Sequence, residues 1–188
     1  MSTTEQMGAA RIDHVVVPGT FDPVTLGHMD VISRTRKLFP RVTVAVAASV
    51  NKRGRGTAFT LEERVEMLRQ ALAEEGLSDV EVMPFTGLLV DFCHGIGALG
   101  VVKGLRAMTD FEYELQQADL NCHMAPDIES VFVMSNPKYG YVSSSIVREI
   151  SSMGSDVSSL VPPCVNQRLR EHYCAQPDGA AGPFLSLP

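Results

Sequence analysis

A loop rich in glycine and proline joins a short apolar run to a histidine early in the chain. The run His14-Val15-Val16-Val17 is followed by Pro18-Gly19-Thr20-Phe21-Asp22-Pro23-Val24-Thr25-Leu26-Gly27-His28. This order is typical of a strand, a tight loop and the first turn of a helix. Helix N-termini have unpaired N–H groups and attract phosphate, and His28 could donate a hydrogen bond to the same anion. The segment predicts a phosphate site, although an isolated Gly-His pair would equally fit a structural turn.

A second group of phosphate-binding residue types lies in the last third of the chain. The run Ser143-Ser144-Ser145-Ile146-Val147-Arg148 follows Tyr139-Gly140-Tyr141-Val142. Serines at a helix start cap it, and their hydroxyls can also hold phosphate oxygens. Arg148 could reach the same anion. A plain serine cap with a solvated arginine is the alternative interpretation.

The elements that must position these residues follow an alternating order. Five apolar, β-branched runs predict strands that are nearly continuous in hydrophobicity, as in parallel sheets covered on both faces. Helical patterns separate and follow them, including a capping box at Thr60–Glu63. The predicted strands are His14–Val17, Val42–Ala47, Val80–Met83, Gly100–Val102 and Ser130–Met134. The predicted helices are Gly27–Phe39, a helix from Thr60 through Leu72, Leu88–His94, Asp110–Met124, Ser144–Met153 and Pro163–Tyr173.

This order predicts an α/β protein with a single-domain, Rossmann-like, doubly wound five-stranded parallel sheet and helices on both faces. We expect the domain to span residues 11–173, with flexible tails at 1–10 and 174–188. The helix Asp110–Met124 is expected to bury an apolar stripe. That stripe consists of Phe111, Leu115, Ala118 and Cys122.

Ligands of such sheets bind beyond the carboxyl ends of the strands. Lys52 follows the second predicted strand, and Lys103 and Arg106 follow the fourth. Any one of these cations could be a solvated surface charge. Together they would surround a pocket for several phosphates, which the sequence therefore predicts at this edge of the sheet.

Composition restricts the class of protein further. The 188 residues are 45% hydrophobic and 20% charged, with a formal net charge of −6, which argues against a protein that coats nucleic acid. No run approaches the roughly 18 apolar residues of a membrane span, and the polar first ten residues do not resemble a signal peptide. Four scattered cysteines predict a reducing, cytoplasmic setting. Cys93-His94 and Cys122-His123 lack metal-ligand spacing and are expected at packing or surface positions.

Both phosphate-binding segments resemble known signatures. Thr25-Leu26-Gly27-His28 and Ser143–Arg148 are similar to the two motifs of the nucleotidyltransferase superfamily with a (T/H)xGH signature. The helix start Phe59–Arg64 and the block Lys103-Gly104-Leu105-Arg106 through Asp110-Phe111-Glu112-Tyr113-Glu114 resemble one family within it, the bacterial phosphopantetheine adenylyltransferases. The resemblance runs from about His14 to about Arg170.

The resemblance implies transfer of the adenylyl group of ATP to 4'-phosphopantetheine, giving dephospho-coenzyme A and pyrophosphate, with Mg²⁺ accompanying ATP. The implied catalytic residues are His28 as transition-state stabiliser, Thr20 and Lys52. The implied ATP-binding residues are Thr20, Phe21, His28, Gly104, Leu105, Arg106, Glu114, Tyr139, Gly140, Tyr141, Val142, Ser143, Ser144 and Ser145. The implied acceptor-binding residues are Thr20, Lys52, Leu89 and Lys103. The common family form has arginine where this chain has Lys103, so the charge is kept but the two-pronged guanidinium is not.

The resemblance also implies a homohexamer. We expect coenzyme A as a feedback inhibitor, because it shares the pantetheine arm with the product, and the sequence shows no dedicated carboxylate cage for a metal. Two alternatives stay open at this point. One is a sister adenylyl- or cytidylyltransferase acting on another phosphorylated acceptor, such as nicotinamide mononucleotide. The other is a catalytically silent nucleotide-binding protein, which intact motifs argue against.

Overall fold

The computed structural model describes residues 11–48, 56–106 and 108–174. Lys52, the predicted tail 1–10 and residues 175–188 of the other predicted tail lie outside the described residues, while Cys174 ends α6. Within this part of the chain, five strands alternate with helices. In chain order the elements are β1 (His14–Gly19), α1 (Leu26–Leu38), β2 (Arg41–Ala47), α2 (Leu61–Glu74), β3 (Glu81–Phe85), α3 (Leu89–Ile96), β4 (Gly100–Leu105), α4 (Met108–Met124), β5 (Glu129–Met134), the 3₁₀ helix η1 (Pro137–Tyr139), α5 (Ser144–Ser152) and α6 (Pro163–Cys174).

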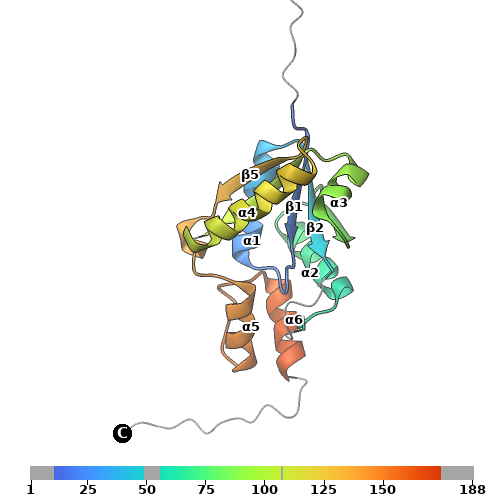
Figure 1. Cartoon of the computed structure of the whole chain (residues 1–188). Helices are drawn as coiled ribbons and strands as arrows, with labels where there is room; N and C mark the ends of the chain where they lie inside the picture. The colour runs from blue at the N-terminus through green and yellow to red at the C-terminus, as the bar shows by residue number, and fades with distance from the viewer. Residues whose placement is uncertain (1–10, 49–55, 107, 175–188) are drawn as a thin grey trace, which may run out of the picture.

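The strands form one parallel sheet in the order β3-β2-β1-β4-β5. This confirms the predicted fold class. The chain adds β2 and β3 on one side of β1, then crosses back and adds β4 and β5 on the other (Figure 1). The carboxyl ends of β1 and β4 therefore diverge into loops that leave in opposite directions. In parallel α/β sheets this switch point is where ligands bind.

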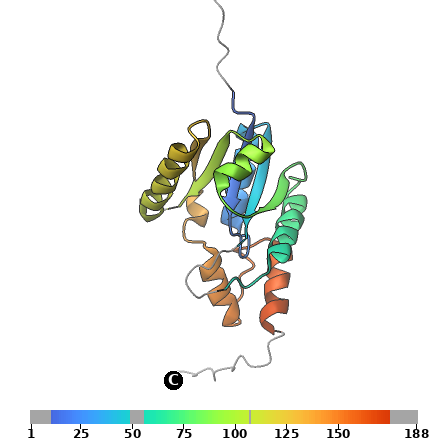
Figure 2. The same cartoon turned by 45° about the vertical axis from the view of Figure 1, so that its right-hand side comes forward.

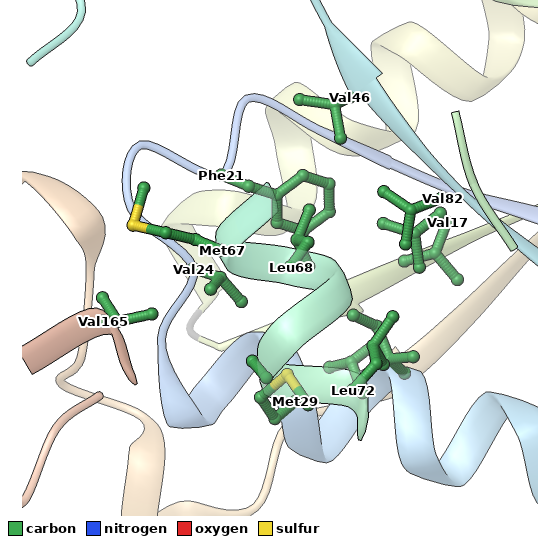
Figure 3. Packing of buried hydrophobic residues seen from close by; sticks show 14 of the residues in the cluster. Val17, Phe21, Val24, Met29, Val46, Met67, Leu68, Leu72, Val82 and Val165 are labelled. Atoms are coloured by element: carbon green, nitrogen blue, oxygen red, sulfur yellow. The ribbon is translucent and has the colours of Figure 1, made fainter. Parts of the chain in front are cut away.

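Alternation along β1 divides the core between the two faces of the sheet. Val15 and Val17 belong to a large apolar cluster with α1 and α2, whereas Val16 belongs to a smaller cluster on the α3 side. Figure 3 shows Leu68 and Leu72 on the side of α2 that faces the sheet. Both leucines are fully buried. Burying a side chain of this size stabilises the fold by about 1.5–3 kcal/mol, which fixes α2 against the strands.

The capping box predicted at the start of α2 is present. Thr60 accepts a hydrogen bond from the Glu63 amide at 3.2 Å, and the Glu63 carboxylate accepts one from the Thr60 amide at 2.8 Å. Helices α5 and α6 extend beyond the carboxyl ends of the strands in both views (Figures 1 and 2). They add Val147, Val165 and Leu169 to the larger cluster, so α5 is held at the end of the sheet where the predicted site lies.

Three of the predicted strands run two or three residues further at their carboxyl ends, including β3, which continues from Met83 to Phe85. β1 continues to Gly19, and β4 continues to Leu105, because Lys103, Gly104 and Leu105 pair with Phe132, Val133 and Met134 of β5. Lys103 therefore lies within β4, where it pairs with Phe132 of β5, rather than on a loop after the strand. A strand position fixes its backbone more tightly than a loop would.

The predicted buried stripe of α4 is wrong. Phe111 and Leu115 are each 39% exposed, and Cys122 is exposed, while Ala118 is partly covered. The periodicity was correct for a helix, but α4 packs loosely on β4 and β5 at the edge of the sheet. Its apolar side chains are therefore left on the surface of the single chain.

Candidate active site

A cavity of about 1010 Å³ opens at the carboxyl ends of the strands. The strand ends of β1 and β4, the first turns of α1 and α5, and one side of α4 surround it. Two helix N-termini thus face one space, which favours anions there. The lining residues that the sequence predicted are Thr20, Phe21, His28, Leu89, Lys103, Gly104, Arg106, Glu114, Ser143, Ser144 and Ser145.

His28 is held by the residue that caps its own helix. The Thr25 amide donates to His28 Nδ1 at 3.0 Å, and the Thr25 hydroxyl lies 3.1 Å from the same nitrogen. A backbone N–H can only donate, so Nδ1 is the unprotonated nitrogen and Nε2 carries the hydrogen. Burial, with Arg106 nearby, lowers the pKa of His28 to about 4. At neutral pH the side chain is therefore a neutral Nε2–H donor.

The loop between β1 and α1 brings Phe21 against His28. The Phe21 backbone has φ of 49°, a left-handed conformation that costs energy for a residue with a large side chain. Its ring folds back over Gly19, where an added Cβ would lie only 2.8 Å from Cζ of the ring. The ring centroid lies 5.1 Å from that of His28, in an edge-to-face arrangement. Thr20, the residue before Phe21, lines the cavity.

Two cations enter the cavity from β4 and the residue after it. Lys103 Nζ lies 3.2 Å from Glu114 Oε2, and both side chains are mostly covered. Arg106 donates from Nη1 to the Val142 carbonyl at 2.9 Å, which ties the end of β4 to the segment before α5. The carboxylate of Glu114 balances only part of the local positive charge, so the cavity keeps its attraction for polyanions.

The serine run forms the start of α5 as predicted. Ser143 is the N-cap and accepts from the Ile146 amide at 3.2 Å, and Ser145 Oγ lies 3.1 Å from Ser143 Oγ. Ser144 donates its hydroxyl to the Pro23 carbonyl at 2.8 Å. The capping role and the cavity position are therefore combined in the same three residues, and neither interpretation of the motif excludes the other.

Five predicted ATP-binding residues do not line the cavity. Leu105 and Val142 are buried in the core, and Tyr141 is 68% exposed. Tyr139 lies beside Gly27, where an added Cβ would come within 3.4 Å of the Tyr139 Cβ. Gly140 ends η1. Tyr139–Val142 cover the end of η1 and the segment before α5, and Leu105 ends β4. Lys52 lies outside the described residues.

Two charged residues that the sequence did not assign to the site organise its back wall. Asp22 is almost fully buried and accepts from the Ala58 and Phe59 amides, each at 3.0 Å. The Asp22 carboxylate also pairs with Arg148 at 3.1 Å, so that arginine is held in the wall of the cavity. The second residue, Arg64, is 2% exposed. In the sequence, the only signal for Asp22 was an aspartate before a proline in the loop after the first strand. The hydrogen-bond partners of Asp22 could not be predicted from the sequence.

The cysteines take the predicted packing and surface positions where their side chains are described. Cys93 and Cys164 are buried, which raises the pKa of each thiol to about 11, and Cys122 is exposed.

Across residues 11–48, 56–106 and 108–174, no three His, Cys, Asp or Glu side chains gather as a metal site. None of the helices in these ranges is long and apolar enough to cross a membrane.

The fold and this cavity define a nucleotidyltransferase-type α/β protein, and the sequence comparisons agree. Residues 16–150 match the family model described as cytidylyltransferase-like. The chain is 48% identical over 160 residues to a phosphopantetheine adenylyltransferase from a Nocardioides species, covering 85% of this chain and 97% of the relative. It is 50% identical over 159 residues to one from Thermobifida fusca, covering 85% of this chain and 93% of the relative. The chain belongs to the phosphopantetheine adenylyltransferase family, within the cytidylyltransferase-like group.

Solved structures support the fold at greater distance. A bifunctional NMN adenylyltransferase/ADP ribose pyrophosphatase from Francisella tularensis superposes with a TM-score of 0.65 at 15% identity, covering 88% of this chain and 51% of that one. Its complex with AMP and a manganese ion gives a TM-score of 0.62 at 15% identity, covering 88% and 52%. The present chain spans about half the length of that protein, so the likeness concerns the shared domain alone.

Proposed function

We propose that the protein transfers the adenylyl group of ATP to 4'-phosphopantetheine, giving dephospho-coenzyme A and pyrophosphate. The observation that carries this proposal is the convergence of His28, Lys103, Arg106 and the α5 serines on one cavity at the switch point of the sheet. The relatives at 48–50% identity carry the name of this activity. A cavity of about 1010 Å³ is also large enough for two phosphorylated substrates side by side.

The acceptor phosphate is the nucleophile of the proposed reaction. A phosphate monoester has a second pKa of about 6 and is mostly dianionic at neutral pH. One of its oxygens attacks the α-phosphorus of ATP, a new P–O bond forms, and the bond to the bridging oxygen of pyrophosphate breaks. No proton has to be removed from the nucleophile, so no general base is required. The protein has to align two polyanions and neutralise the charge between them.

His28 suits the α-phosphate because of its tautomer. Nδ1 is engaged by Thr25, so the Nε2–H is the atom left to donate. A neutral imidazole donates a hydrogen bond without titrating near pH 7, since its pKa is about 4. A preorganised donor of this kind stabilises charge that develops on the oxygens around the α-phosphorus. Thr20 also lines the cavity, and we assign it to the boundary between the two proposed substrate sites.

Lys103 and Leu89 line the side of the cavity that we assign to 4'-phosphopantetheine, together with Lys52 outside the described residues. Lys103 would exchange its contact with Glu114 for the acceptor phosphate. Arg106 and the amides at the start of α5 would hold the phosphates of ATP, and the strand end Gly104–Leu105 and Glu114 would frame the nucleotide. The wall from Tyr139 to Val142 would support the same nucleotide from behind.

Mg²⁺ would enter as a companion of ATP. The polar side chains of the cavity wall are mostly hydroxyls and cations, and its carboxylates Asp22 and Glu114 are already paired with Arg148 and Lys103. This donor set fits a metal held by phosphate oxygens and water rather than by a carboxylate cage. When bound, the ion supplies charge neutralisation at the departing pyrophosphate.

We further propose a cytoplasmic homo-oligomer, a hexamer by family resemblance. Exposed apolar side chains on α4 support self-association, because a soluble monomer rarely leaves a contiguous apolar patch uncovered. By helical spacing Tyr113, Leu120 and Met124 share one side of α4, while Phe111 and Leu115 lie on the other. Coenzyme A shares the pantetheine arm of the acceptor and would compete for the same cavity as a feedback inhibitor.

A direct assay tests the proposed function against its nearest rival. The protein is incubated with ATP, Mg²⁺ and either 4'-phosphopantetheine or nicotinamide mononucleotide, and products are identified by mass. We expect dephospho-coenzyme A and pyrophosphate from the first mixture and no dinucleotide above background from the second. Product from nicotinamide mononucleotide alone would reassign the acceptor, and no adenylylated product from either would reject the transferase activity.

A further inference from the structure

Arg64 is a buried charge that lies directly behind the cavity wall. It stands in the first turn of α2 and is 2% exposed, so its guanidinium is almost entirely removed from water. It does not line the cavity. Burial lowers the pKa of Arg64, while the charges of Asp22 and Glu62 oppose that shift. Burying an arginine costs free energy of folding unless its N–H groups donate hydrogen bonds within the protein.

The guanidinium joins three backbone carbonyls from three segments. Nη1 donates to the Thr20 carbonyl at 2.6 Å and to the Ala47 carbonyl at 3.0 Å, and Nε donates to the Thr60 carbonyl at 3.3 Å. Thr20 and Ala47 both line the cavity on their other side. A single planar group thus connects the end of β1, the end of β2 and the start of α2.

The sheet itself cannot hold Thr20 in place. The last register pair between β1 and β2 is Gly19 with Val46, so Thr20 is one residue beyond the ladder. The next residue, Phe21, adopts a left-handed conformation that ordinary strand geometry does not supply. Ala47 likewise leads directly into the segment that contains Lys52. The hydrogen bonds from Arg64 replace the missing ladder at the point where both strands meet the cavity.

We propose that Arg64 is a positioning residue for adenylyl transfer, which clamps the carboxyl ends of β1 and β2 so that Thr20 is held at the reacting phosphates. This inference rests on the proposed function. The hydrogen-bond acceptors of Arg64 are neutral backbone carbonyls, and no carboxylate among the described residues bonds the guanidinium directly. Arg64 therefore also adds positive potential behind the polyanion site. Lysine in its place has a single nitrogen, so it could not keep the Nε contact to Thr60 together with the Nη1 contacts to Thr20 and Ala47.

The test compares Arg64→Lys and Arg64→Met with a matched control on the same helix. Arg69→Met removes an arginine of α2 that donates to one backbone carbonyl, that of Val82 at 3.0 Å, away from the cavity. Folding is checked by thermal unfolding, active sites are counted by ATP binding, and kcat and KM are measured well below the unfolding temperature. Hydrogen exchange measured by mass spectrometry follows the amides of residues 18–25.

We expect Arg64→Lys to fold and to lose kcat by about 10- to 100-fold per active site, since misplacement of about 1 Å can cost 100-fold. Its KM for ATP should change by less than about 3-fold, because Arg106 and the amides at the start of α5, which would hold the ATP phosphates, are not contacted by Arg64. Exchange in residues 18–25 should accelerate. Arg64→Met should lose more kcat, and Arg69→Met should stay within about 2-fold of wild type in kcat and in exchange.

A folded Arg64→Lys with near wild-type kcat overturns the inference, as does a lowered kcat without faster exchange in residues 18–25. If neither Arg64 variant folds while Arg69→Met does, Arg64 is needed for the fold and the positioning role is rejected. Failure of the proposed function is distinguishable, because wild-type protein would then make no dephospho-coenzyme A while the exchange comparison would still report on the clamp.

Discussion

The ammonium group of Lys103 lies 3.2 Å from Oε2 of Glu114, which joins a residue assigned to the acceptor site with one assigned to the nucleotide site. Lys103 comes from β4 and Glu114 from α4, and both line the same cavity. An incoming acceptor phosphate would compete with Glu114 for the same cation. The pair therefore couples the two proposed subsites through one side chain.

Lys103→Ala should weaken acceptor binding more than ATP binding. We expect the KM for 4'-phosphopantetheine to rise by about 10-fold or more, because a hydrogen bond to a charged group contributes about 1.5–3 kcal/mol. Lys103→Arg should retain most activity, since it keeps the charge and adds a second donor. Lys37→Ala, an exposed lysine in the last turn of α1, is the control. An unchanged acceptor KM in Lys103→Ala would remove Lys103 from the proposed acceptor site.

His28→Ala should fold and bind ATP but lose most of its turnover. Removing one preorganised donor to a developing oxyanion typically lowers kcat by about 100-fold or more. His94→Ala is a matched control, because His94 is an exposed histidine of α3 paired with Asp127 at 3.1 Å. Steady-state kinetics with both variants decides the matter. Turnover of His28→Ala near the wild-type rate would show that the Nε2–H does not act on the α-phosphate.

The protonation state of His28 can be followed separately from activity. Its pKa is lowered from 6.5 to about 4 in the folded protein, so its imidazole should keep the neutral Nε2–H form at pH 5.5. Nitrogen-15 NMR of the histidine rings measures this directly. As the pH falls from about 7 to about 5, the unfolded chain gains a proton at this residue and the folded chain stays largely neutral there. Acid should therefore destabilise wild-type protein more than His28→Gln in urea unfolding over this window. A His28 that titrates near 6.5 would contradict the assigned burial.

The parallel sheet and most of the cavity could be predicted from sequence because they depend on local signals. Continuous β-branched runs identified the strands, and the capping box at Thr60 identified the start of α2. Once strands are parallel, their carboxyl ends must share one edge, which brought His28, Lys103 and Arg106 together. Motif residues at the strand ends were thus placed by topology alone.

The parts that could not be predicted depend on long-range contacts. In the sequence, Arg64 is an ordinary polar residue in the first turn of a helix. Its burial depends on the packing of α2 against the ends of β1 and β2. The left-handed Phe21 is stabilised by the space over Gly19, which no local pattern reveals. Helical periodicity in α4 identified an apolar face, but periodicity does not say whether the covering surface belongs to the same chain.

Gly104→Ala should impair both stability and turnover. A Cβ at this position would lie 2.6 Å from Cγ2 of Val31, so α1 would have to move away from β4. Overpacking of this kind costs about 1–3 kcal/mol, and any shift of α1 also moves His28. Gly95→Ala in α3 meets nothing within 4 Å and should be neutral or stabilise the protein by up to about 1 kcal/mol. Urea unfolding and kcat of the two variants test the close contact, and equal stability would show that α1 yields without cost.

Leu120→Lys should disrupt the proposed oligomer while leaving the monomer folded. Leu120 is 54% exposed on α4, so the single chain loses little packing when it is replaced, whereas a charge in an apolar interface must be desolvated without a partner. Leu38→Lys at the end of α1, where the leucine is 64% exposed, is the control. We expect light scattering after size exclusion to give a smaller mass for Leu120→Lys alone, with unchanged far-UV circular dichroism. If both variants keep the wild-type mass, the side of α4 that carries Leu120 does not form the interface.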